Sequence, residues 1–327
     1  MKNNKKILQR IATLLSIIFV ANIIYANDLS KVQFTIGRSD VEKDRFVIED
    51  KEYLKRVGKV HTKKFYAYEV DKENNEGNYI YFDVTGNERK MNIDMEVLPN
   101  KIVWNKKHLV YDKETPLNYD MFYGIDVSRH NGNINWKKVK EAGFDFAFVR
   151  IVYRGYGKAG RLMQDENGVR NLKNAKKNGI KIGAYVFSQA VNDEEALEEA
   201  KFAVSILKNE KIELDLPLVY DIETIRDNIA RTDDVDGSVF TNNAITFCEH
   251  VKNMGLTPAI YSNMVWQDYY FDMKKLNDYE IWYADYREYP QSPYHFTYWQ
   301  FSESGKVSGV TDNGGYVDLN VRFVEKN

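Results

Sequence analysis

The chain has a single cysteine, Cys248, among 327 residues, so no disulfide can form within it. Cys248 lies on the apolar face of a helical pattern, where we expect it to be part of the core. An excess of one charge is also absent, since 46 basic and 48 acidic side chains leave a formal net charge of −2. That balance gives no sign of a nucleic-acid-binding protein. Hydrophobic residues at 43% and charged residues at 29% are typical of a folded soluble protein, and the length suits two domains or one large barrel.

The N-terminus has no apolar run of full membrane-spanning length, but it has the pattern of a targeting signal. Basic residues precede a mostly apolar run over 11–21, a further apolar stretch to Ala26, and polar residues over 27–30. We expect residues 1–26 to be a signal peptide that is cleaved after Ala26. Ile24 is large for the −3 position of such a site, so an uncleaved N-terminal anchor is the alternative. In both cases the rest of the chain is secreted or lies in the cell envelope or periplasm, and it meets the membrane only if the segment stays uncleaved.

Residues 27–118 are predicted to form a small β-rich domain of unknown role. Short runs alternate in polarity with period two, as in antiparallel strands, and polar turns separate them. The expected strands cover 32–36, 64–70, 79–84, 102–104 and 108–111. This domain either attaches the rest of the chain to a polymer or partner, or is a structural appendage. The polar segment 111–118, which contains a proline, is the expected linker.

From residue 119 to the C-terminus, strands alternate with helices. The expected strands cover 122–128, 144–151, 181–188, 216–223, 258–262, 280–285, 297–301 and 316–323. The expected helices cover 135–142, 167–178, 193–207 and 241–254, the third with Asn192 and Glu195 as a capping box. This alternation predicts a parallel sheet with right-handed crossovers, and eight strands predict closure. The fold class is therefore α/β, an irregular TIM-like (β/α) barrel with reduced helices in its last third.

The stretch 216–224 is predicted to be a buried strand that ends on two carboxylates, Asp221 and Glu223. Residues at i and i+2 of a strand point to the same face, so both carboxylates leave the strand together, about 6 to 7 Å apart at their Cα atoms. Two acids held that close cannot ionise independently, and we expect one to have a raised pKa. Such a pair suits glycoside hydrolysis, which needs a protonated acid and a charged partner. An isolated Asp-x-Glu is nevertheless more often two surface acids at a solvated strand end.

Polar residues also gather at the predicted carboxyl ends of the other strands, where a barrel carries its chemistry. They are Asp126, Ser128, Arg150, Ser188, Gln189, Tyr261, Ser262, Asp285, Trp299 and Gln300. One acid such as Asp126 or Asp285 is more often a helix cap or a turn residue. Several at one rim favour a functional site.

Several sequence blocks in the same region carry a family resemblance. They are Tyr123-Gly-Ile-Asp-Val-Ser-Arg-His-Asn-Gly132, Ile134-Asn-Trp136, Gly183-Ala-Tyr-Val-Phe-Ser188, Val219-Tyr-Asp-Ile-Glu223, Ile260-Tyr-Ser262, Trp282-Tyr-Ala-Asp285, Trp299-Gln300 and Val317-Asp-Leu-Asn320. In this order they resemble glycoside hydrolase family 25, the lysozymes of the cellosyl and phage-endolysin type. The resemblance covers residues from about 120 to 327 and leaves 27–115 outside it.

The resemblance implies a β-1,4-N-acetylmuramidase whose partner is the glycan strand of peptidoglycan. It implies Glu223 as the general acid, Asp221 as its close stabilising or orienting partner, and Asp126 and Asp318 as a third and fourth carboxylate. Glu223 is expected to hold its proton near neutral pH, and Asp221 is expected to stay charged. Neighbouring-group attack by the substrate's acetamido group and direct attack by water both stay open.

Seven further residues are expected to bind the substrate: Tyr185, Tyr261, Trp282, Asp285, Trp299, Gln300 and His130. The aromatic residues among them either offer flat faces to sugar rings or fill the barrel interior. His130 has no nearby ligand partner and is not a metal site. No metal and no organic cofactor is implied, and the oligomeric state is left open.

The chain departs from the family pattern in two blocks. Residues 150–156 replace a common Lys-Ala-Thr-Glu-Gly block, and residues 185–190 replace a Tyr-His-Phe run, which puts substrate detail in doubt. Two alternatives to a lysozyme stay open. One is a non-catalytic protein that binds cell-wall glycan, which has no reason to keep a repelling acid pair. The other is a chitinase-like Asp-x-Glu hydrolase.

Overall fold

A computed structural model describes residues 45–48, 66–71, 76–82, 88–94, 97, 100–102, 104–105, 115–225, 228–287 and 290–326. The chain divides into two compact units, one of residues 1–91 with 102–117 and one of 92–101 with 118–327. The predicted signal peptide and the expected strands at 32–36 and 108–111 lie outside the described residues. Within them, no helix combines the length and the apolar character needed to cross a membrane.

The described residues before 117 form short strands. β1 (Arg45–Ile48), β2 (Tyr66–Asp71), β3 (Glu76–Phe82) and β4 (Glu88–Asp94) form one sheet in that order, and β5 (Trp104–Asn105) pairs with β6 (Thr115–Pro116). The β1–β2, β2–β3 and β5–β6 pairs are antiparallel. The sequence predicted β2 and β3 but missed β4, because only Met91 and Ile93 interrupt its charged and polar residues. Those two alternate side chains are buried, as in a strand with one solvent-facing side.

The second unit is a closed barrel. Its strands are β7 (Tyr119–Val127), β8 (Phe146–Arg154), β10 (Lys181–Ser188), β11 (Leu218–Ile222), β12 (Pro258–Asn263), β13 (Glu280–Ala284), β14 (Tyr298–Lys306) and β15 (Tyr316–Glu325). They pair in the order β10-β11-β12-β13-β14-β15-β7-β8, and pairing of β8 with β10 closes the ring. The short β9 (Leu162–Gln164) extends the edge of β8. The eight strands predicted from the sequence are these barrel strands.

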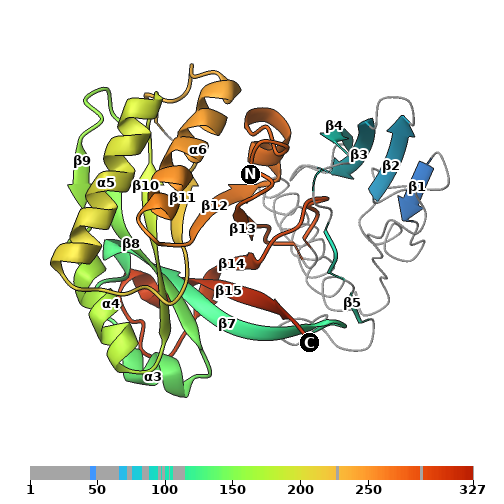
Figure 1. Cartoon of the computed structure of the whole chain (residues 1–327). Coiled ribbons are helices and arrows are strands. Elements are labelled where there is room, and N and C mark those ends of the chain that lie inside the picture. The colour runs from blue at the N-terminus through green and yellow to red at the C-terminus, as the bar shows by residue number, and fades with distance from the viewer. Residues whose placement is uncertain are drawn as a thin grey trace, which may run out of the picture. The chain divides into compact units, whose positions relative to one another are not determined.

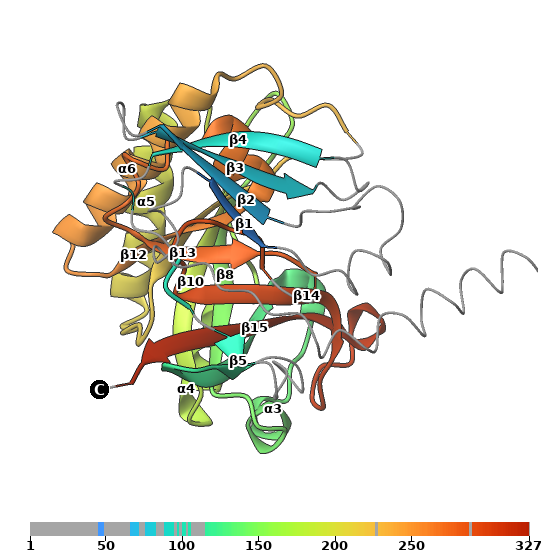
Figure 2. The same ribbon diagram turned by 90° about the vertical axis from the view of Figure 1, so that its right-hand side faces the viewer.

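The direction of the last strand differs from the prediction of a parallel sheet. β15 is antiparallel to both of its neighbours, β14 and β7, and the arrows of β14 and β15 point in opposite directions in Figure 2. The connection between β14 and β15 is short and holds only the turn η5 (Asn313–Gly315). A parallel return needs a crossover of a dozen or more residues, so a hairpin is the available solution.

Helices cover part of the barrel wall. They are α3 (Trp136–Glu141), α4 (Gly168–Lys177), α5 (Asp193–Asn209) and α6 (Gly237–Asn253), with the single turns η3 (Arg129–Asn131) and η4 (Trp266–Tyr270). Figure 1 shows α4, α5 and α6 along the outside of the strands, where α4 and α5 pack on β8 and β10 and α6 packs on β11 and β12. Cys248 is buried in α6, as expected.

The predicted capping box of α5 is half formed. The Asn192 side chain accepts a hydrogen bond from the Glu195 backbone N–H at 2.9 Å, as in a capping box. The Glu195 carboxylate instead accepts from the Val191 N–H and pairs with Arg231. Glu195 therefore ties a neighbouring loop to the helix start.

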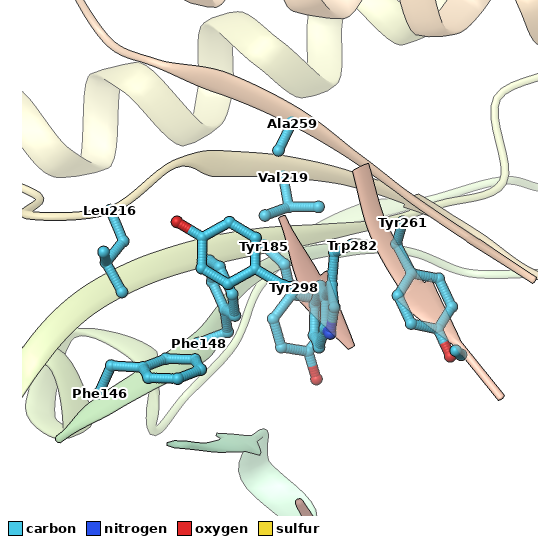
Figure 3. Packing of buried hydrophobic residues seen from close by; sticks show 10 residues of the cluster. Phe146, Phe148, Tyr185, Leu216, Val219, Ala259, Tyr261, Trp282 and Tyr298 are labelled. Atoms are coloured by element: carbon cyan, nitrogen blue, oxygen red, sulfur yellow. The ribbon is translucent and has the colours of Figure 1, made fainter. Parts of the chain in front are cut away.

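The lower part of the barrel interior is a packed core of mainly aromatic side chains. Figure 3 shows its members, which are Phe146, Phe148, Tyr185, Leu216, Val219, Ala259, Tyr261, Trp282, Ala284 and Tyr298. The rings of Phe148 and Trp282 stack at 4.7 Å between centroids. Glycine is required at two inward positions, because a Cβ at Gly124 or Gly183 would lie 2.4 Å from a phenylalanine ring. This core fills the middle of the barrel.

Candidate active site

A pocket of about 350 Å³ opens at the carboxyl ends of the parallel strands. Its lining residues are Asp126, Arg150, Tyr185, Phe187, Asp221, Glu223, Tyr261, Trp282, Tyr286, Gln300, Glu303 and Asp318. All four predicted carboxylates are among them, together with four of the residues expected to bind substrate. Asp318 reaches this rim because β15 runs antiparallel, so the start of that strand lies beside the ends of its neighbours.

Alternation along each strand explains which side chains point inward. Tyr185 on β10, Asp221 on β11 and Tyr261 on β12 share the inward face with core residues of the same strands. Glu223 follows Asp221 by two residues and reaches the same pocket, as the spacing predicted. The Gln189 side chain fixes the backbone there by donating to the Glu223 carbonyl at 3.0 Å.

Asp221 is the more deeply buried member of the Asp-x-Glu pair. Its side chain is 4% exposed, whereas Glu223 is half-buried. Burial raises the pKa of Asp221 well above its ordinary value, and the neighbouring charges of Glu223 and Asp126 raise it further, while Arg150 opposes them. The Oδ1 atom of Asp221 is buried and has no hydrogen-bond partner among the described residues. It is therefore free to accept a hydrogen bond from a ligand.

The second acid pair, Asp126 and Asp318, lies on adjacent strands in direct register. Burial raises the pKa of Asp126, although hydrogen bonds from Asn320, Gln300 and Asp318 oppose the shift. Burial and the adjacent Asp126 charge raise the pKa of Asp318 to about 9. At neutral pH the proton of this pair is thus on Asp318, and Asp126 is the carboxylate that accepts hydrogen bonds.

The raised pKa of Asp221 differs from the protonation that the sequence predicted. The sequence argument expected Glu223 to carry the proton and Asp221 to stay charged, but the deeper burial of Asp221 raises the pKa of that carboxyl instead. The proton belongs to the Asp221–Glu223 pair, since interacting acids titrate together. Spacing along the chain does not indicate this difference in burial, because both acids lie at the end of one strand and on the same face.

A chain of oriented side chains holds Asp126 in place. Gln300 Nε2 and Asn320 Nδ2 each donate to Asp126 Oδ2 at 2.8 Å. The Gln300 Oε1 atom accepts from the hydroxyls of Tyr261 and Tyr286, both at 2.9 Å. These contacts fix which end of the amide is the donor. The pocket floor is therefore pre-organised around one carboxylate.

Trp282 extends this hydrogen-bond network into the aromatic core. Its Nε1–H donates to Asn320 Oδ1 at 2.8 Å, and the ring is 1% exposed within the aromatic core. Of the two interpretations left open for this residue, the geometry favours a filled barrel interior. Tyr286, with 45% of its surface exposed, instead presents a ring at the pocket that the sequence argument did not single out.

Three residues predicted to bind substrate lie outside the pocket lining. Trp299 is fully buried and donates its Nε1–H to the Asp285 carbonyl at 2.7 Å, because it alternates with the inward-facing Gln300. Asp285 accepts from the Tyr283 hydroxyl and the Gln291 backbone N–H, which makes it a buried turn residue. His130 is exposed on η3. Partial loss of solvent around its ring lowers its pKa, and the positive charges of Arg150 and Arg129 lower it further.

A local irregularity in β14 adds another acid to the pocket. Gln300 pairs with Asn320 but Ser302 pairs with Leu319, so β14 contains an extra residue at this point. Such a bulge reverses the alternation and turns Glu303 inward. The sequence carries no recognisable signal for it. Among the described residues, no group of three or more His, Cys, Asp or Glu is arranged to hold a metal ion.

A closed α/β barrel with paired carboxylates at the carboxyl ends of its strands has the groups that a glycoside hydrolase needs. The family model "Glycosyl hydrolases family 25" matches residues 125–310, and the chain belongs to this family. The resemblance seen in the sequence blocks is thereby confirmed.

Known relatives match part of the chain at 21 to 39% identity. The uncharacterized protein YegX of Escherichia coli K12 is 28% identical over 218 residues, which is 63% of this chain and 71% of YegX. Lysozyme M1 of Streptomyces globisporus is 39% identical over 66 residues, 20% of each chain. The modular autolysin LytC of Streptococcus pneumoniae superimposes with a TM-score of 0.55 at 21% identity, over 79% of this chain and 61% of LytC. At that identity the LytC structure shows a shared fold.

Proposed function

We propose that this protein is a lysozyme that hydrolyses the β-1,4 bond between N-acetylmuramic acid and N-acetylglucosamine in peptidoglycan. The observation that carries the proposal is the paired arrangement in the pocket: half-buried Glu223 lies two residues from buried Asp221, and Asp126 is oriented beside them. Lysozyme M1 and the LytC structure, which was determined with a synthetic peptidoglycan ligand, support this substrate class.

In the proposed reaction Glu223 is the general acid. It is the more accessible carboxyl of its pair, so it donates the shared proton to the leaving glycosidic oxygen. While the proton is on Glu223, Asp221 is the charged member of the pair, and both are carboxylates once the proton has left. The Asp221 Oδ1 atom, without a protein hydrogen-bond partner among the described residues, accepts the N–H of the substrate's acetamido group and orients that group toward the anomeric carbon.

Asp126 acts in this proposal as a fixed negative charge near the developing oxocarbenium ion. Donors on Gln300 and Asn320 keep its carboxylate oriented, and Asp318 holds the neighbouring proton. Tyr286 is proposed to contact a sugar ring at the rim, because its ring is exposed while its hydroxyl is held by Gln300. Tyr185, Tyr261, Trp282 and Gln300 shape the lower wall.

Three further proposals concern the rest of the chain. Residues 1–26 are proposed to be a signal peptide, which would deliver a secreted or envelope-acting protein. Residues 27–118 are proposed as a separate β-rich domain and 119–327 as the catalytic one. The N-terminal unit would hold the enzyme at its polymer or partner.

The test is release of new reducing ends from purified peptidoglycan, with mass analysis of the fragments. The wild-type chain is expected to release ends on muramic acid, and Glu223→Gln is expected to lower kcat at least about a hundredfold, the typical contribution of a general acid. Glu303→Gln is the comparison variant, since it removes another pocket acid without touching the pair. Binding without new ends would identify a glycan-binding protein, and cleavage of N-acetylglucosamine oligomers alone would identify a chitinase-like enzyme.

A further inference from the structure

The charges around the pocket are unequal. Among its described lining residues, five are acids and one, Arg150, is a cation. Acids confined together with little water cannot all ionise, because each charge disfavours the next. A single fixed cation in such a site therefore has a large influence on which carboxyl loses its proton.

Arg150 is held in place by a buried carboxylate behind the pocket wall. Its Nε donates to Asp165 Oδ2 at 2.8 Å, and the Asp165 side chain is fully buried. Asp165 also accepts the backbone N–H of Arg129 at 3.1 Å and that of Asn167 at 3.0 Å. Asp165 thus connects the strand that carries Arg150 to the turn that follows Asp126.

Stacking fixes the guanidinium from a second side. An extra residue in β8 after Arg150 changes the register against β10, so Tyr153 comes to lie beside Arg150. The Arg150 and Arg129 guanidinium carbons each lie 5.0 Å from the centre of the Tyr153 ring. Such contacts restrict a long side chain to one orientation.

The terminal nitrogens of Arg150 are available to groups in the pocket, which Arg150 lines. Among the described residues the Arg150 side chain donates a hydrogen bond through Nε, to Asp165, and the side chain is 11% exposed. Arg150 pairs in register with Tyr185, and its charge acts on both Tyr185 and Asp221. The cation therefore acts on the acid pair from β8, which is separated from β11 only by β10.

We propose that Arg150, oriented by Asp165, is the positioning residue of the Asp221–Glu223 pair, a fixed counter-charge that lets Asp221 become a carboxylate while Glu223 delivers the proton. This rests on the proposed hydrolase function. The other titratable or charged groups around Asp221 are Asp126, Tyr185, Glu223, Tyr261, Tyr286, Glu303 and Asp318, and those behind Arg150 are Arg129, His130 and Asp165. Of these groups, Glu223 and Asp126 raise the pKa of Asp221, and Arg150 lowers it.

The experiment compares Arg150→Met, Arg150→Lys and Asp165→Asn with the wild type over a range of pH. Arg161→Met is the control, because Arg161 is an exposed arginine outside the pocket lining. The first measurement follows the titration of the Asp221 carboxyl by NMR in protein labelled at the aspartate carboxyl carbons. The Asp221→Asn variant identifies the Asp221 signal, because that signal is missing from its spectrum. Arg150→Met is expected to raise the Asp221 midpoint by about one pH unit or more, the usual effect of one nearby opposite charge. In Arg150→Lys the Asp221 midpoint should stay close to the wild-type value, because the positive charge is kept. In Asp165→Asn the midpoint should lie between those of the wild type and Arg150→Met.

The second measurement is kcat/KM against pH on peptidoglycan. The acid limb of the profile reports ionisation of Asp221, so in Arg150→Met it is expected to move to higher pH by the same amount. An acid limb and an NMR midpoint that both stay unchanged in folded Arg150→Met would overturn the proposal, as would a loss of activity that is equal at every pH. If the wild type shows no hydrolysis, the proposed function is wrong, and the NMR shift alone still decides the role of Arg150.

Discussion

Replacing Asp318 by asparagine is predicted to stabilise the protein at neutral pH. Burial and the Asp126 charge raise the Asp318 pKa from 3.8 to about 9, so the folded protein keeps a proton that the unfolded chain releases. The stability of the folded state therefore falls as the pH rises from about 4 to about 9. Each pH unit in this window costs about 1.4 kcal/mol, which amounts to about 4 kcal/mol at pH 7. An asparagine has no proton to lose and its amide can still donate to Asp126.

The measurement is urea unfolding of wild type and Asp318→Asn at pH 4, 7 and 9. We expect a gain of about 2 to 4 kcal/mol at pH 7 and little difference at pH 4, together with lower activity, because functional acids often cost stability. Asp120→Asn is the control, since that acid is 63% exposed and lies 3.9 Å from Lys326. Its effect should stay within about 0.5 kcal/mol. A variant less stable than wild type at pH 7, or a gain that does not change with pH, would refute the reasoning.

Two further predictions concern the barrel interior. Gly183→Ala puts a Cβ 2.4 Å from the Phe148 ring and should cost about 1 to 3 kcal/mol in urea unfolding; Gly155→Ala, whose nearest contact would be at 3.8 Å, should cost less than 1 kcal/mol. Gln300→Leu leaves the buried Tyr261 hydroxyl without its acceptor and should lower the free energy of unfolding by about 3 kcal/mol. A loss below 1 kcal/mol for Gln300→Leu would mean that the hydroxyl finds another partner.

Much of the barrel could be predicted from local patterns. Apolar runs of five to eight residues and the capping residue Asn192 are recognised within a few positions of the chain, and the structure has the corresponding strands and helices. The meeting of Asp126, Asp221 and Glu223 at one rim was also predictable, since the carboxyl ends of parallel strands lie at one edge. Asp318 reaches that rim only because β15 is antiparallel. The antiparallel direction of β15 was not predictable from local patterns. It depends on the short connection from β14 and on the position of β15 between β14 and β7 in the closed ring.

The acids at the pocket show where sequence reasoning stops. The spacing of Asp221 and Glu223 was sufficient to predict that they share a face, because strand geometry repeats every two residues. Their unequal burial depends on neighbouring strands, and it decides that the Asp221 pKa is raised. A bulge turns Glu303 inward, and alternation turns Trp299 away although the motif containing it was recognised.

The sequence by itself determined the family, the order of strands and helices, and the identity of the carboxylates, since these depend on residue type and spacing along the chain. Tertiary structure alone decided the register between strands, the position of Arg150 on Asp165, and the hydrogen-bond chain from Tyr261 and Tyr286 through Gln300 to Asp126. Those features join residues that are far apart in sequence. Protonation follows from them, because burial and neighbouring charge exist only in the folded chain.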